Sequence, residues 1–200
     1  MGGPVRLGIL GGTFDPVHAG HLVAAVNARH ELELDLVLLV VANEPWQKVG
    51  SRPVTPAADR LALVEAAVDG VDGLEASAIE IARGGPSYTA DTVAALRERY
   101  PAAELYLIVG ADAAAGLGTW ERIEEVRSQV VLVVVNRPGT TMGRLALLQG
   151  WVARMVEVPA LEISSTELRD RVASGRPLDF LVPMAAIRVI RERGLYSVPR

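Results

Sequence analysis

Short apolar runs alternate with longer segments of helical composition along the chain. Residues 36–41 and 130–135 are apolar at every position, which is typical of parallel strands covered on both faces. The pattern predicts strands at residues 5–10, 36–41, 74–81, 105–109, 130–135 and 155–158. It predicts helices at residues 19–32, 56–68, 90–100, 120–126, 142–153, 167–173 and 183–193.

This alternation of strands and helices predicts an α/β fold built on a doubly wound parallel sheet. Local signals support the helix ends, because Pro56 suits a first helical turn and Gly194 is a usual stop. No internal repeat or low-complexity linker divides the chain. We therefore expect a single domain over residues 1–200, with a C-terminal helical part at about residues 160–200.

The less usual residue choices gather where the predicted strands end. Ligands of doubly wound sheets bind beyond the carboxyl ends of the strands, so this edge is where a site is expected. The segments that fall there are residues 11–21, 43–48, 87–89, 110–112, 136–137 and 163–166.

Composition narrows the class of protein. The chain has 200 residues, a net charge of −4 and no cysteine, which disfavours a general nucleic-acid binder, a disulfide framework and thiol chemistry. Its apolar runs are too short to span a bilayer, and we expect no signal peptide. The sequence thus predicts a cytoplasmic protein.

The stretch at residues 11–22 joins the first predicted strand to the first helix. Gly11 and Gly12 carry no Cβ atoms, so a phosphate can approach the backbone near the positive end of the helix dipole. His18 and His21 stand three residues apart at the helix start, so both rings project from one face. The alternative is that one histidine caps the helix and the other packs in the core. A zinc site is disfavoured, since there is no cysteine and no third histidine nearby.

Two familiar nucleotide-site patterns fit this sequence poorly. A dinucleotide fingerprint needs G-x-G-x-x-G and an acidic residue about twenty residues later. Here the glycines are Gly8, Gly11 and Gly12, and the second strand leads into Asn43. A Walker A site is also excluded, because no Gly-Lys-Ser/Thr sequence occurs.

Lys48 is the only lysine among 20 basic residues, and it lies at the expected ligand edge. A compact ammonium on a flexible stem suits phosphate binding as a point charge. The alternative is chance retention of one surface lysine.

Residues 11–21 read G-G-T-F-D-P-V-H-A-G-H, which resembles the H-x-G-H signature of the nucleotidyltransferase superfamily. In this longer form it is similar to the bacterial nicotinate-nucleotide adenylyltransferases. Similar family segments follow at residues 86–92 (P-S-Y-T-A-D-T), 110–112 with Trp120, 137–139 (R-P-G), 163–169 (I-S-S-T-E-L-R) and 194–196 (G-L-Y). The resemblance covers nearly the whole chain and implies a Rossmann-like nucleotidyltransferase fold.

The resemblance implies transfer of the adenylyl group of ATP, with Mg²⁺, to nicotinate mononucleotide, giving the dinucleotide and pyrophosphate. The attacking phosphate monoester is already anionic, so catalysis reduces to positioning and electrostatic stabilisation. The resemblance implies His18, His21 and Lys48 as catalytic residues, with the histidines on the α- and β-phosphates and Lys48 following the leaving charge. Small-molecule substrates are the expected partners, without nucleic acid or membrane, and a homo-oligomer is left open.

The resemblance also assigns binding residues. For ATP they are Gly11, Gly12, Thr13, Phe14, His18, His21, Gly110, Asp112, Ile163, Ser164, Ser165, Thr166 and Arg169. For the nicotinate nucleotide they are Asn43, Lys48, Ser87, Tyr88, Thr89, Asp112, Trp120 and Arg137. No protein ligand to a metal is assigned.

One loop departs from the family pattern. The family often has N-x-x-P-H-K, whereas Trp46 and Gln47 precede Lys48 here, which leaves open how the loop closes on its substrates. Simpler roles also remain: Trp120 in the core, Asp112 or one of Ser165 and Thr166 as helix caps, and Arg169 in a surface ion pair. Two other functions stay open, a phosphopantetheine adenylyltransferase, which shares H-x-G-H and the I-S-S-T helix, and a non-catalytic nucleotide sensor.

Overall fold

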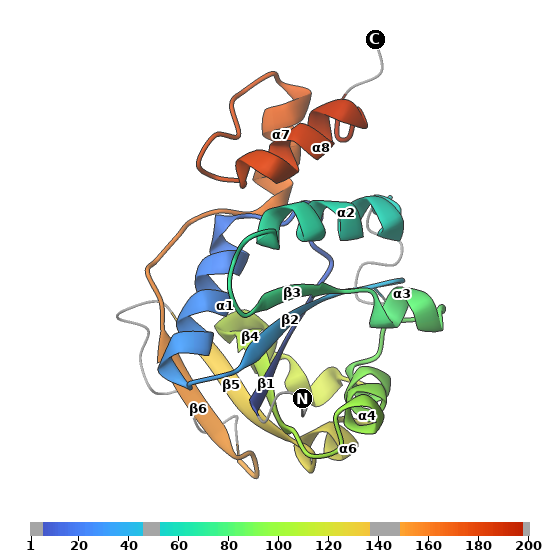
Figure 1. Cartoon of the computed structure of the whole chain (residues 1–200), viewed down its shortest axis with the longest axis vertical. Helices are drawn as coiled ribbons and strands as arrows, with labels where there is room; N and C mark the ends of the chain where they lie inside the picture. The colour runs from blue at the N-terminus through green and yellow to red at the C-terminus, as the bar shows by residue number, and fades with distance from the viewer. Residues whose placement is uncertain (1–5, 46–52, 137–148, 198–200) are drawn as a thin grey trace.

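A six-stranded parallel sheet forms the centre of the part described by the computed structural model, residues 6–45, 53–136 and 149–197 (Figure 1). Each strand pairs in parallel with its neighbours, in the order β3-β2-β1-β4-β5-β6. The predicted α/β class and doubly wound parallel sheet are confirmed. The strands are β1 (Arg6–Gly12), β2 (Leu36–Val41), β3 (Leu74–Ser77), β4 (Glu104–Gly110), β5 (Val130–Asn136) and β6 (Ala153–Glu157).

Helices cover both faces of this sheet. The helices are α1 (Ala19–Glu31), α2 (Ala57–Val68), α3 (Ile79–Arg83), α4 (Thr89–Arg99), α5 (Ala111–Ala115), α6 (Ile123–Arg127), α7 (Ser165–Ala173) and α8 (Met184–Glu192), with a 3₁₀ turn at Leu117–Thr119. In Figure 1, α2 lies on the opposite side of the sheet from α4 and α6. Across the described ranges, every helix is too short or too polar to cross a membrane.

Apolar side chains along each central strand point alternately into two cores. Leu10 and Ile108 belong to the core beneath α1 and α2, whereas Ile9 and Leu107 belong to the core beneath α4 and α6. A parallel strand buried on both faces needs apolar residues at consecutive positions, which explains the uninterrupted apolar runs in the sequence.

Helix α8 packs on the outer side of α2 rather than on the sheet itself (Figure 1). Ala186, Ile187 and Ile190 form the buried face of α8. Arg193, just beyond the helix, pairs with Asp59 of α2 at 2.6 Å. This arrangement places α8 beside α2, which itself covers β2 and β3.

Several predicted boundaries were wrong. The strand predicted at 74–81 ends at Ser77, whose hydroxyl accepts the N–H of Ile79 at 3.4 Å as the chain turns into α3. The predicted helix at 142–153 does not reach its end, because Ala153 begins β6; residues 137–148 lie outside the described ranges. The helix predicted at 120–126 begins only at Ile123, after Arg122 in a left-handed conformation.

The strand order reverses between β1 and β4. Moving outward from this point, the sheet continues through β2 to β3 on one side and through β5 to β6 on the other. A crevice opens at such a reversal beyond the carboxyl ends of the strands, because the flanking connections leave in opposite directions. Gly12 and Gly110, which end β1 and β4, lie at this point.

Candidate active site

The glycines after the first strand belong to the sheet itself. The turn predicted to begin at Gly11 begins later, because Gly11 and Gly12 still pair with Val40 and Val41 of β2. A Cβ atom on Gly11 would meet nothing within 4 Å, so the backbone there is open to a ligand. A Cβ on Gly12 would lie 2.8 Å from the ring of Phe14, so Gly12 makes room for that side chain.

Phe14 supports one of the two histidines. It is 2% exposed and adopts a left-handed conformation with φ of 50°. Its ring meets the ring of His21 edge-on, with centroids 5.0 Å apart and planes at 77°. The buried Phe14 ring therefore holds the His21 imidazole in place by edge-to-face packing.

His18 and His21 lie together at the start of α1, as their spacing predicts. The backbone N–H of His18 donates to Nδ1 of His21 at 3.2 Å, and the ring centroids are 3.7 Å apart. Gly20 lies close to this pair, because a Cβ there would come within 3.1 Å of His18 Nδ1. Glycine therefore suits this position of the H-x-G-H motif, because a larger residue would crowd the His18 ring.

The environment sets the protonation of His18 and the tautomer of His21. His18 is 7% exposed, and its burial lowers the pKa to about 4 because the charged form loses its hydration. His18 is therefore neutral near pH 7. Nδ1 of His21 accepts an N–H, so in the neutral ring the proton lies on Nε2, which makes Nε2 a hydrogen-bond donor.

Two hollows open on either side of the strand-order reversal. The first, of about 460 Å³, lies toward β2 and α4, and the second, of about 380 Å³, lies toward β5 and the segment before α7. Both are lined by Leu10, His21, Gly110 and Asp112. The two hollows therefore share part of their walls, including His21.

The hollows contain only part of the predicted set. The predicted residues within the described ranges that line neither hollow are Phe14, Asn43, Tyr88, Ser164, Ser165, Thr166 and Arg169. In addition to the shared His21, Gly110 and Asp112, the first contains Gly11, Gly12, Thr13, Ser87, Thr89 and Trp120. The second contains His18 and Ile163. Lys48 and Arg137, like Trp46 and Gln47, lie outside the described residues.

Trp120 and Asp112 both line the first hollow. Trp120 is half-buried; it lines the first hollow and also packs against the core beneath α4. Asp112 is exposed within the first turn of α5, so it does not take the N-cap position itself.

Two loops beside the first hollow are joined by hydrogen bonds. The N–H of Asn43 donates to the Ser87 hydroxyl at 2.8 Å, and the Asn43 amide donates to the carbonyl of Gly85 at 2.9 Å. Tyr88 follows in an extended conformation as the N-cap of α4, so the positive end of this helix begins at Thr89 in the hollow.

Helix α7 is tied to the loop between β1 and α1. The Ser165 hydroxyl donates to the carbonyl of Pro16 at 2.9 Å, and Arg169 donates to the carbonyl of Asp15 at 2.8 Å and to the Thr166 hydroxyl at 3.0 Å. The predicted cap was wrong: Ser164, rather than Ser165 or Thr166, is extended and accepts the N–H of Glu167.

Polar residues that sequence reasoning missed lie beneath the same edge. The buried polar side chains of the described ranges are Asp15, His18, Arg60, Glu80 and Thr92, and only His18 was predicted. Glu80 and Thr92 line the first hollow, and the Thr92 hydroxyl donates to Glu80 at 2.5 Å. The sequence could have predicted that Arg60 is buried, because it lies three residues before Leu63 and so shares the apolar face of α2.

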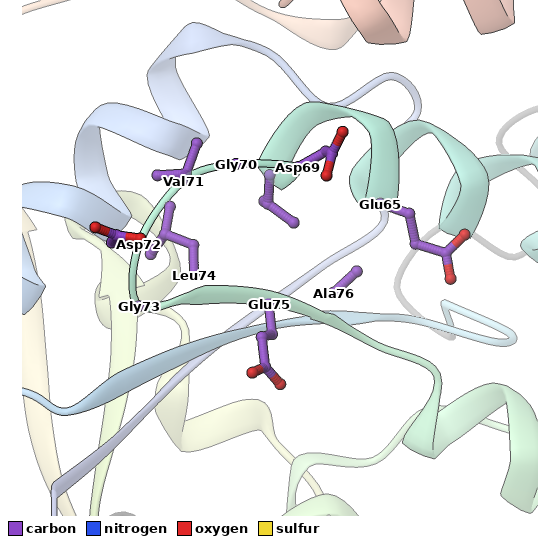
Figure 2. Close-up of a pocket in the computed structure, with 10 residues that line it drawn as sticks. Glu65, Asp69, Gly70, Val71, Asp72, Gly73, Leu74, Glu75 and Ala76 are labelled. Carbon is purple, nitrogen blue, oxygen red and sulfur yellow. The ribbon is translucent and has the colours of Figure 1, made fainter.

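Another concave surface lies at the opposite edge of the sheet, between α2 and β3 (Figure 2). Glu65, Asp69, Asp72 and Glu75 line it, and Figure 2 shows Glu65, Asp72 and Glu75 pointing in different directions. Within the described ranges, no group of three or more His, Cys, Asp or Glu side chains is arranged to hold a metal ion.

Comparisons with known proteins indicate the family and the fold of this chain. A cytidylyltransferase-like family model matches residues 9–171. The probable nicotinate-nucleotide adenylyltransferase of Corynebacterium kroppenstedtii is 46% identical over 96% of this chain and 90% of its own. That of Streptomyces coelicolor is 46% identical over 94% of this chain and 98% of its own. The fold resembles the nicotinic acid mononucleotide adenylyltransferase of Plasmodium falciparum complexed with APC, with a TM-score of 0.77 and 17% identity over 96% of both chains.

Proposed function

This chain belongs to the cytidylyltransferase-like family and to its nicotinate-nucleotide adenylyltransferases, and from that membership we propose how its residues carry out the reaction. The chain transfers the adenylyl group of ATP to nicotinate mononucleotide, a step of NAD biosynthesis. The observation that carries the proposed assignment of residues is that two ligand-sized hollows share one wall at His21.

In this reaction a phosphate oxygen of nicotinate mononucleotide attacks the α-phosphorus of ATP. A new P–O bond forms as the bond from the α-phosphorus to the bridging oxygen breaks, and pyrophosphate leaves with the bonding pair. The attacking oxygen is already anionic near pH 7, so the protein needs no strong base. Its task is to align the two phosphates and to stabilise charge on the leaving oxygens.

We assign the first hollow to nicotinate mononucleotide and the second to ATP. Gly11, Gly12 and Thr13, which the resemblance assigns to ATP, lie instead in the first hollow. The half-buried indole of Trp120 offers a flat face for the pyridine ring, and the N-terminus of α4 at Thr89 favours a negative group. The loops that border this hollow contain Tyr88, Asn43 and Ser87. The hydrogen bond between Asn43 and Ser87 joins the two loops. His18 and Ile163 border the second hollow, beside the proposed α-phosphate position at His21.

His21 is the proposed donor to the reacting phosphates. The backbone N–H of His18 donates to Nδ1 of His21, so the proton of the neutral His21 ring lies on Nε2. The neutral His18 ring packs against the His21 ring. The open backbone at Gly11 and the N-terminus of α1 add favourable dipoles for phosphate. Lys48 is proposed to neutralise the leaving pyrophosphate, and Arg137 to contact phosphate of the acceptor.

The start of α7 is proposed to border the ATP phosphates. Ser165 and Arg169 hold this helix against the Asp15–Pro16 backbone, so they also set the shape of the phosphate turn, residues 13–18 between β1 and α1. Ser164 and Thr166 make their hydrogen bonds within the helix itself. Magnesium is proposed to enter as part of the MgATP substrate, since the described residues offer no cluster that fits a resident metal.

The experiment that tests this function mixes the protein, ATP and magnesium with one acceptor at a time. Pyrophosphate release is expected with nicotinate mononucleotide, and little with phosphopantetheine. Preference for phosphopantetheine would identify the other adenylyltransferase, and ATP binding without pyrophosphate release would identify a sensor. A single domain and a cytoplasmic location remain predictions from the sequence.

A further inference from the structure

Arg60 of α2 is the most deeply buried arginine of the described ranges, at 1% exposure. It lines neither of the two hollows, so it does not contact a substrate there. A fully buried guanidinium is costly to desolvate unless its N–H groups find partners. The identity of those partners indicates what the side chain does.

Each nitrogen of the guanidinium donates to a backbone carbonyl in a different segment. Nη1 donates to Thr13 at 2.8 Å, Nη2 to Asn43 at 3.1 Å, and Nε to Thr55 at 2.7 Å. Thr13 belongs to the phosphate turn after β1, and Asn43 begins the loop after β2. One planar group therefore joins the two loops that border the first hollow.

The charge of Arg60 has a buried counterpart. Burial lowers the pKa of the guanidinium, and the negative charge of Asp15 opposes that shift. Asp15 is 1% exposed and accepts a hydrogen bond from the Tyr196 hydroxyl at 2.9 Å. Tyr196, from beyond α8, thus joins the same cluster beneath the phosphate turn.

We propose that Arg60 is a positioning residue. Its hydrogen bonds set the distance between Thr13 in the phosphate turn and Asn43 at the start of the loop after β2. This inference rests on the proposed adenylyl transfer and deepens it. In-line attack requires the acceptor phosphate within about 3–3.5 Å of the α-phosphorus, and a displacement of about 1 Å can cost about 100-fold in rate. The sequence between Asn43 and Thr55 also contains Lys48, so Arg60 bonds to the chain on both sides of that residue.

The test is Arg60→Lys, which keeps the positive charge and removes the planar fork. One ammonium nitrogen cannot replace three nitrogens spread over a guanidinium. We expect kcat to fall about 10- to 100-fold while KM for ATP and for nicotinate mononucleotide changes less than about threefold. Activity is measured as pyrophosphate release, and the folded fraction by circular dichroism at the assay temperature.

The matched control is Arg97→Lys. Arg97 also joins two backbone carbonyls, donating to Ala103 at 2.6 Å and to Gln129 at 2.9 Å, but these residues precede β4 and β5 at the opposite edge of the sheet. A purely structural arginine loses stability on this change and keeps its kcat per folded molecule. We expect that result for Arg97→Lys alone.

The outcomes separate the two proposals. Wild-type protein without pyrophosphate release would refute the proposed function, whereas an active wild type with full kcat in Arg60→Lys would overturn the positioning role. If Arg60→Lys does not fold, the double variant Asp15→Asn/Arg60→Gln is measured instead, because it removes both buried charges together. The same fall in kcat is expected for it, and full kcat would overturn the positioning role. Failure of both variants to fold would show that Arg60 is structural only, and would also overturn the inference.

Discussion

Gly20→Ala should lower kcat while leaving Tm nearly unchanged. The added methyl group crowds the His18 ring, but alanine also stabilises the helix relative to glycine. Gly20 is the second residue of α1. A Cβ atom there would lie 3.1 Å from Nδ1 and 3.2 Å from Cε1 of His18. The ring must give by a few tenths of an ångström, and its stacking on His21 at 3.7 Å limits where it can go.

The expected effect on stability is small. Alanine is about 0.8–1.0 kcal/mol more favourable than glycine inside a helix, and forcing a ring off its preferred rotamer costs about 0.5–1.5 kcal/mol. These contributions nearly cancel. For a protein of this size a difference of about 1 kcal/mol moves Tm by about 2–4 °C, so we expect a shift no larger than that.

The expected effect on activity is larger. If about 1 Å of misplacement costs about 100-fold, a shift of a few tenths of an ångström costs about 3- to 10-fold in kcat. Pyrophosphate release at saturating substrates gives kcat, and thermal unfolding followed by circular dichroism gives Tm. Gly118→Ala is the control, because a Cβ there meets nothing within 4 Å. Full kcat in Gly20→Ala would refute the argument that the position of the His18 ring limits the reaction.

His21→Ala should lower kcat by about 10²–10³, the usual cost of removing one donor to developing negative charge, and near-normal turnover would contradict its assignment. Lys48→Arg should lose substantial activity with little change in Tm; an active variant would favour chance retention of the lysine. Trp120→Ala should raise KM for nicotinate mononucleotide by about 5- to 150-fold and largely spare kcat, as expected for loss of ring stacking worth about 1–3 kcal/mol. Trp120→Phe should recover most of that affinity, whereas unfolding of Trp120→Ala would place the indole in the core. His18 has a pKa of about 4 when folded, below its usual 6.5, so only the unfolded chain binds a proton between these values. Stability should therefore fall as pH drops from 6.5 toward 4, by on the order of 2 kcal/mol at pH 5, in urea unfolding titrations. His18→Gln should lose this dependence, and exposed His30→Gln should keep it.

The sequence alone determined the alternation of strands and helices and the edge of the sheet where a site forms. Consecutive apolar residues at 36–41 and 130–135 indicate burial on both faces, and their alternation with helical segments favours a covered parallel sheet. His18 and His21 share a face because three residues make nearly one helical turn. These are local relationships, so neighbouring residues were enough to predict them.

Tertiary structure decided where elements begin and end. Gly11 and Gly12 read as a turn, yet they stay in β1 because Val40 and Val41 of β2 supply partners for them. The apolar stretch at residues 74–81 has strand composition, but only residues 74–77 find a neighbouring strand. Pairing depends on a second segment that is distant in sequence, and local propensity cannot report whether that segment is present.

The buried polar cluster was also decided by tertiary structure. Asp15 and Tyr196 are 181 positions apart, and Arg60 joins three backbone carbonyls whose own side chains are irrelevant to the contact. A backbone carbonyl is the same at every residue, so no side-chain pattern marks which ones a buried guanidinium will meet. The sequence could place Arg60 on the buried face of α2, but only the folded arrangement of β1, β2 and α2 determined what it holds together.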